Sequence, residues 1–169
     1  ILPLFCEIDD FCKFFEQFSQ TRAISDRKRR KRATNLSQSE VMTILVLYHL
    51  SGYKNLKAFY LQEILRHHSS DFPRLCSYQR FVQLQSRCVM PLFFYLLTKL
   101  GSCTGISFID ATPLKVCHNL RIPSHRVFRG SAERDKSSTG WYYGFKLHLA
   151  INVKGEILGF YLTSANVDE

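Results

Sequence analysis

The sequence has few acidic residues and no long apolar run. Asp and Glu number 14 against 23 Lys and Arg, which gives a formal charge of +9 and an isoelectric point near 9.4. No stretch reaches the roughly 18 to 20 apolar residues that a membrane-spanning helix needs. The apolar residues 1–5 are too few for a signal peptide and run into acidic residues. We therefore expect a cytoplasmic protein with no membrane partner.

The chain also lacks paired cysteines. None of its six cysteines forms a C-x-x-C pair, and most lie inside apolar runs, which favours buried free thiols over a zinc site. They are Cys6, Cys12, Cys76, Cys88, Cys103 and Cys117.

The excess of cations favours a polyanionic partner, with nucleic acid as the first choice. A basic protein without such a partner is the alternative. Six consecutive cations repel one another and predict a solvated loop or helix end that contacts the DNA or RNA backbone, although many such runs are only solvated. The run is Arg27, Lys28, Arg29, Arg30, Lys31 and Arg32.

Residues 1–100 carry helical patterns. Apolar residues from Leu4 to Phe18 recur at steps of three and four, which predicts one amphipathic helix. Ser37 and Glu40 form a capping box that predicts a helix ending near residue 52. Further helices are expected over 56–65, from residue 77, and through residue 100 after a first-turn proline.

The period changes at about residue 105. Alternating apolar residues over 143–153 and again over 156–163 predict two strands joined by a tight turn at Lys154-Gly155. A long basic loop is expected over 111–140. We therefore predict an α+β protein with a helical region over 1–100 and a second region over 101–169.

Asp110 is the best candidate for catalysis. It ends a short apolar run and precedes Thr112-Pro113, so we expect a buried strand that breaks directly after the carboxylate. Metal-dependent phosphoryl transfer uses carboxylates to hold a pair of metal ions. An Asp before Thr and Pro is also a common turn sequence, and the residues alone leave both interpretations open.

Three cations of the second region are candidates for DNA contact. Arg121 and Arg126 lie in the long loop, and Lys146 lies on the strand face opposite Phe145. A lysine there can touch a phosphate, although a surface cation on a half-exposed strand is the more common case. His148, on the same face, is expected to be structural.

Segments along nearly the whole chain resemble DDE transposases of bacterial insertion sequences, particularly the nine-eight-two group. The matching segments are Ile8-Asp9-Asp10-Phe11-Cys12, Leu36-Ser37-Gln38-Ser39-Glu40-Val41, Gly52-Tyr53, Phe59-Tyr60, Tyr78-Gln79-Arg80-Phe81, Ile109-Asp110-Ala111-Thr112-Pro113-Leu114, Val116-Cys117-His118-Asn119-Leu120-Arg121-Ile122, Tyr143-Gly144-Phe145-Lys146-Leu147-His148-Leu149 and Leu162-Thr163-Ser164-Ala165-Asn166-Val167-Asp168.

This resemblance implies an RNase H-like catalytic domain behind a helical, DNA-binding region over 1–100. Such enzymes cut and join double-stranded DNA at the element's terminal repeats and at the target, using two Asp, one Glu and Mg²⁺. Asp110 matches the first Asp and would be a metal ligand. The oligomeric state stays open, a homo-oligomer of the complete enzyme included.

The contexts of the second Asp and of the Glu are absent, and Asp168 matches a position before the second Asp. We therefore expect a truncated transposase that binds DNA but is inactive alone, with an exposed strand edge beside Asp110. Glu156 is expected at the far end of the sheet from Asp110. The alternatives are a non-catalytic DNA-binding remnant that competes with intact transposase, and a basic structural or RNA-associated protein.

Overall fold

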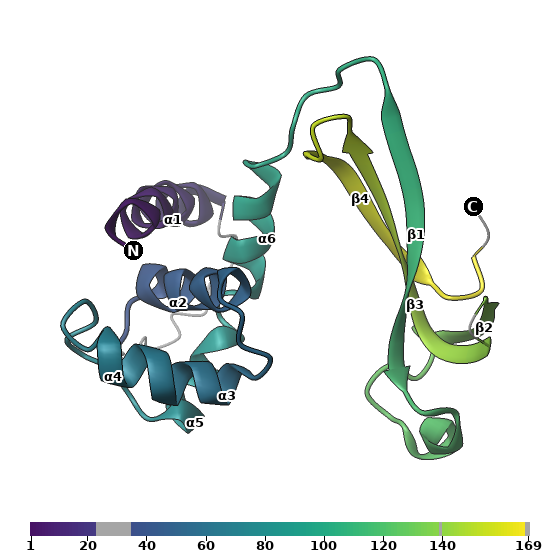
Figure 1. Cartoon of the computed structure of the whole chain (residues 1–169), viewed down its shortest axis with the longest axis horizontal. Helices are drawn as coiled ribbons and strands as arrows, with labels where there is room; N and C mark the ends of the chain where they lie inside the picture. The colour runs from purple at the N-terminus through teal and green to yellow at the C-terminus, as the bar shows by residue number, and fades with distance from the viewer. Residues whose placement is uncertain (23–34, 139, 168–169) are drawn as a thin grey trace. The chain divides into compact units, whose positions relative to one another are not determined.

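The computed structural model describes residues 1–22, 35–138 and 140–167. The chain forms two compact units, Ile1–Thr98 and Lys99–Glu169 (Figure 1). The six-cation run at residues 27–32 lies outside the described residues. Within the described part, no helix is long and apolar enough to cross a membrane.

The first unit is helical. Its elements are α1 (Leu2–Arg22), α2 (Gln38–Leu50), α3 (Leu56–Phe59), the π-helical turn η1 (Tyr60–Ile64), α4 (Leu65–His67), α5 (Tyr78–Gln85) and α6 (Val89–Leu97). Each helix predicted from the sequence is present. The last one ends at Leu97 rather than at residue 100, and the one expected over 56–65 continues as α3, η1 and α4.

Polar side chains start these helices by accepting hydrogen bonds from backbone N–H groups that no earlier turn can satisfy. The Ser37 hydroxyl accepts from the N–H of Glu40 at 3.1 Å, and the Glu40 carboxylate accepts from the N–H of Ser37 at 2.6 Å, so the predicted capping box is confirmed. Asn55 caps α3 and Ser77 caps α5 in the same way.

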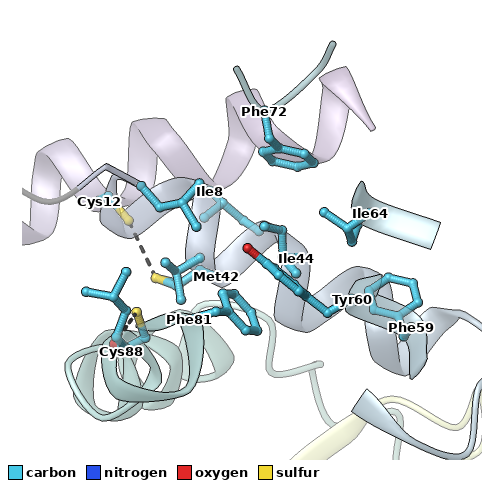
Figure 2. Packing of buried hydrophobic residues seen from close by; sticks show 13 residues of the cluster. Ile8, Cys12, Met42, Ile44, Phe59, Tyr60, Ile64, Phe72, Phe81 and Cys88 are labelled. Atoms are coloured by element: carbon cyan, nitrogen blue, oxygen red, sulfur yellow. Dashed lines mark hydrogen bonds between the residues drawn. The ribbon is translucent and has the colours of Figure 1, made fainter. Parts of the chain in front are cut away.

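One apolar core holds the helical unit together (Figure 2). Ile8 from α1, Met42 from α2 and Phe81 from α5 are all fully buried in it. The rings of Tyr60 and Phe81 stack with centroids 4.6 Å apart, and the Tyr60 hydroxyl donates to the carbonyl of Cys76 at 2.7 Å. An aromatic pair of this kind contributes about 0.5–1.5 kcal/mol of stability beyond the apolar area that it buries.

Two of the six thiols lie in this core. Cys12 and Cys88 are buried, and burial raises the pKa of each to about 11. Cys12 donates to the sulfur of Met42 at 3.6 Å, which Figure 2 marks with a dashed line. The prediction of buried free thiols is confirmed for these two, but it is wrong for Cys6 and Cys103, which are exposed.

The second unit is an antiparallel sheet. Its elements are β1 (Ser107–Cys117), the 3-10 turn η2 (Asn119–Ser124), β2 (Glu133–Ser137), β3 (Gly140–Asn152) and β4 (Ile157–Ser164). β3 is central: β1 pairs along one side of it, while β2 and β4 pair with successive halves of its other side.

The predicted break after Asp110 is wrong, because β1 continues through it to Cys117. A residue before proline is pushed toward extended backbone, so Thr112 favours the strand instead of ending it. Pro113 lacks an N–H, which an edge strand tolerates. The expected long loop over 111–140 therefore contains the rest of β1, η2 and β2.

The predicted turn at Lys154-Gly155 is confirmed. Gly155 has a φ of 80°, a conformation that favours glycine, and its N–H donates to the carbonyl of Asn152. The buried Asn152 side chain fixes this hairpin. Its oxygen accepts from the N–H groups of Lys154 and Glu156 at 2.9 Å each, and its amide donates to the carbonyl of Ser102.

The expected position of Glu156 is also wrong. β1 starts beside the hairpin, since Ser107 pairs with Asn152, and Asp110 lies only three pairs further along. Glu156 is therefore at the same end of the sheet as Asp110. Its carboxylate accepts from the Asn152 amide at 2.6 Å, which gives it a structural role in the hairpin.

Candidate functional site

Asp110 lies on one identifiable face of the sheet. It pairs directly with Leu149 of β3, and directly paired residues of antiparallel strands project to the same face. Leu149 pairs in turn with Phe160 of β4. The expectation of a buried strand is wrong here, because Asp110 is exposed and its neighbour Phe108 is 57% exposed.

The described residues do not by themselves make a metal centre at Asp110. They contain no group of three or more His, Cys, Asp or Glu side chains that could hold an ion. On the Asp110 face the adjoining pairs are Phe108 with Ile151 and Thr112 with Leu147, so the carboxylate stands among apolar groups and one hydroxyl. Asp110 could supply one oxygen ligand, and a Mg²⁺ site would need further ligands from elsewhere.

The same face carries a raised loop further along β3. Tyr143 and Phe145 lie on the Asp110 face because they alternate with it through Leu147 and Leu149. The His125 ring meets the Tyr143 ring at 6.1 Å, and the Phe128 ring meets the Phe145 ring at 5.4 Å. The Tyr143 hydroxyl also donates to the carbonyl of Phe128 at 3.3 Å.

These contacts fix residues 125–129 over the sheet, and we call this segment the basic ridge. His125 stacks on Phe128 with centroids 5.8 Å apart, so the ridge has a small aromatic core of its own. Its two arginines, Arg126 and Arg129, are exposed. The predicted DNA contact Arg126 is thus brought to the same face as Asp110.

β2 adds two more cations to that face through the alternation of its sequence. Arg134 pairs with Tyr143 and Lys136 pairs with Trp141, so both cations project to the Asp110 face. Glu133 and Asp135 alternate with them and therefore project to the other face. The strand thus separates its charges, with the cations on the side of Asp110.

Arg121 lies in η2, at the end of the sheet remote from the hairpin (Figure 1). The side-chain amide of Asn119 donates to the carbonyl of Trp141 at 2.9 Å, which attaches η2 to β3. Arg121 is exposed. It therefore belongs to the same end of the unit as the basic ridge.

Lys146, the third candidate from the sequence, lies on the opposite face from Asp110, as its alternation with Phe145 predicts. Its ammonium is 3.2 Å from the carboxylate of Asp135 and donates to the carbonyl of Val167 at 3.0 Å. The Lys146 side chain is 15% exposed. The structure therefore gives Lys146 internal partners and does not bring it together with Asp110.

Asp135 is the centre of this second polar group. The backbone N–H of Lys136 holds the pKa of the Asp135 carboxyl below its ordinary value of 3.8, and the Lys146 ammonium lowers it further. The hydroxyl of the buried Tyr142 lies 3.5 Å from the same carboxylate. A hollow of about 440 Å³ opens beside these groups, with Ala111 and Pro113 of β1 along its other wall.

His148 has the structural role expected for it. Its Nε2 lies 3.0 Å from the hydroxyl of Thr163 on β4, in a half-buried position on the Lys146 face.

Sequence reasoning assigned no function to Trp141 or Lys136, and it named Arg134 only as part of a long basic loop that is an alternative DNA surface. The available signals were the single tryptophan of the chain and the acid–base alternation of residues 133–136. These signals can be interpreted only when residues 133–137 are known to be a strand, because alternating residues lie on opposite faces only in extended backbone.

Comparison with known proteins gives one match. No curated protein and no solved structure matches the chain. Transposases act on DNA, and DDE domains generally depend on divalent metal ions. The family model described as a transposase DDE domain matches residues 100–169, so the second unit is similar to a transposase DDE domain.

Proposed function

We propose that this chain is part of a transposase of a bacterial insertion sequence, of the nine-eight-two group, and acts in DNA transposition. The observation that carries the proposal is the shared sheet face of Asp110 and the basic ridge, within the segment that matches a transposase DDE domain. A carboxylate on the same face as exposed arginines suits a phosphodiester substrate, because the arginines bind the backbone while the carboxylate lies near the bond to be cut.

The strand order of the sheet supports the proposal that the second unit is part of an RNase H-like domain. β1, β3 and β4 form an antiparallel run in which β1 carries Asp110, and β1 pairs only with β3 among the described strands. The free edge of β1 offers unpaired N–H and C=O groups, which a further strand of the complete domain would satisfy. In the complete enzyme Asp110 would be one carboxylate ligand of the divalent metal, which would lower the barrier to phosphodiester cleavage.

DNA binding in this proposal has two parts. The cations of the second unit, Arg121 and Arg126 among them, bind the backbone on the Asp110 face. The helical unit and the six-cation run at 27–32 hold the terminal repeats. Lys146 contributes less than the arginines, since the Asp135 carboxylate already neutralises it.

The test uses duplex DNA that borders the coding sequence, since the terminal repeats of an insertion sequence flank its gene. We expect the purified chain to bind this duplex and to leave it uncut in Mg²⁺ or Mn²⁺, because one carboxylate cannot hold two metal ions. Fusing the chain to downstream sequence that supplies an Asp and a Glu should give nicking that Asp110→Asn abolishes without loss of binding.

A second candidate function, a remnant that competes with intact transposase, has the same DNA-binding face as its support. It predicts duplex binding with no downstream carboxylates to restore cleavage. Failure of the chain to bind any duplex above the level of a neutral protein would contradict both functions. Nicking by the chain alone that is lost in Asp110→Asn would contradict the claim that Asp110 is the chain's one metal-binding carboxylate. Asp168 would then be the candidate for the second.

A further inference from the structure

Trp141 is a large aromatic side chain that is exposed although its backbone is hydrogen-bonded within the sheet unit. It is 64% exposed, although Tyr142 and Tyr143 beside it are 3% and 8% exposed. Its backbone is paired with Lys136 of β2, and its carbonyl accepts from Asn119 of η2. The strand and η2 therefore hold the backbone of Trp141 in place, so the exposure of the indole does not come from an unpaired loop.

The surroundings of Trp141 are cationic. Lys136 is its direct cross-strand neighbour, and Arg134 is the next residue of β2 on the same face. Both are exposed. An indole beside two cations is poorly suited to an apolar protein partner, which would have to desolvate the charges. It is well suited to a nucleotide, whose base stacks on the ring and whose phosphate meets the cations.

Trp141 also lies on the Asp110 face, because residues 141, 143, 145, 147 and 149 of β3 alternate to one side. Trp141 lies eight positions before Leu149, the partner of Asp110. At roughly 3.3 Å per residue the two sites are at most about 26 Å apart along the strand. That distance corresponds to about eight base pairs of B-form DNA, and the basic ridge lies between them.

From this arrangement we propose that Trp141 is a stacking platform for an unpaired base of the DNA that the Asp110 face binds. A base inside a duplex has both of its faces covered by its neighbours, so only a frayed, flipped or single-stranded base can use the indole. Lys136 and Arg134 hold the phosphates that flank this base. The inference deepens the proposed function and rests on it, since it names the form of DNA that binds at this end of the Asp110 face.

The single tryptophan makes the test direct, because all indole fluorescence of the chain comes from Trp141. The chain is titrated with a single-stranded thymidine oligonucleotide, with a blunt duplex, and with the same duplex carrying an unpaired single-stranded end. We expect saturable quenching with the single strand and the tailed duplex, and little with the blunt duplex. Quenching that is equal for all three would contradict stacking of an unpaired base.

Variants separate this inference from the proposed function. Trp141→Ala should weaken binding of the single strand by about 5- to 140-fold, which is the 1–3 kcal/mol of one base–aromatic stack at 1.4 kcal/mol per tenfold. It should leave the salt slope and the affinity for blunt duplex unchanged, because no charge is removed. Trp141→Phe should restore part of the lost affinity.

The matched control is Tyr161→Ala, which removes another exposed aromatic ring, 69% exposed, from the opposite face of the sheet. We expect no change in single-strand affinity for it. Duplex binding with no effect of Trp141→Ala on the single strand would overturn this inference alone. Absence of any DNA binding by the unaltered chain would overturn the proposed function. Fluorescence that responds to protein concentration but not to DNA would assign Trp141 to a contact between copies and overturn the stacking proposal.

Discussion

Removing the two arginines of the basic ridge should change the salt dependence of DNA binding by a predictable amount. The perturbation is the double variant Arg126→Ala, Arg129→Ala. Both side chains are exposed, and the ridge is fixed by ring contacts of His125 and Phe128 that the substitutions leave in place. The variant should therefore keep its fold and lose only charge.

The magnitude follows from counterion release. Each phosphate neutralised by a cation contributes about 0.9 to the slope of log affinity against log salt concentration on duplex DNA. If each arginine meets one phosphate, the slope should be about 1.8 less steep in the variant. The ratio of wild-type to variant affinity should then shrink by about 12-fold when salt rises from about 50 to 200 mM.

The assay is fluorescence anisotropy of a labelled duplex at several salt concentrations. The control is Lys115→Ala, Lys154→Ala, which removes the same charge from exposed positions of the second unit, one on the opposite face of the sheet and one in the hairpin turn. A general effect of net charge would flatten the slope equally in both variants. That result, or an unchanged slope in the ridge variant, would refute the assignment of the ridge to the DNA backbone.

Three further outcomes are expected. Phe81→Ala should destabilise the helical unit by about 3–5 kcal/mol, because a fully buried ring stacked on Tyr60 leaves a cavity; urea unfolding followed by circular dichroism measures this, and a loss below about 1 kcal/mol would contradict the described core. The lowered pKa of Asp135 stabilises the second unit above pH 3.8, and this contribution is lost as the pH falls through the lowered value. The difference in urea midpoint between wild type and Lys146→Met should therefore close below that pH, whereas a constant difference would show that the ion pair is not its source. Replacing residues 29–31 by Ala should weaken duplex binding and flatten its salt slope by up to about 2.7, and an unchanged slope would leave the second unit as the main DNA surface.

Local side-chain chemistry made the helical unit predictable. Ser37 and Glu40 satisfy each other's backbone N–H groups within one turn, so the start of α2 can be derived from four residues. The turn at Gly155 is similarly local, because a positive φ at that position favours glycine whatever surrounds it.

The sheet was harder to predict where a residue acts through a neighbour on another strand. Pro113 suggested a break, but its missing N–H costs little in an edge strand, and edge position is a property of the whole sheet. Gly144 gave no signal, yet a Cβ there would collide with the carbonyl oxygen of Leu114 on β1. The position of Glu156 beside the start of β1 likewise depends on the register of two strands.

The candidate site was predicted in part for the same reason. Asp110 and Arg126 were found as residue types, but their common face follows from the pairing of β1 with β3 and from the ring contacts of the ridge. The partner of Lys146, Asp135, is eleven positions away on a strand that the sequence did not reveal. Lys146 therefore looked like a surface cation and was proposed to contact DNA. The face of the sheet on which each charged residue lies can be predicted only when the strand is known.

The most direct test of the central claim is to locate bound DNA relative to the two sheet faces. An iron chelate that generates hydroxyl radicals is attached at Asp110→Cys, or at Tyr161→Cys on the opposite face, after Ser replaces the exposed Cys6 and Cys103. The account predicts that the chelate at position 110 cleaves bound duplex within a few base pairs, while the chelate at position 161 cleaves it weakly. Strong cleavage from position 161 with none from position 110 would show that DNA binds the other face, and would contradict the account.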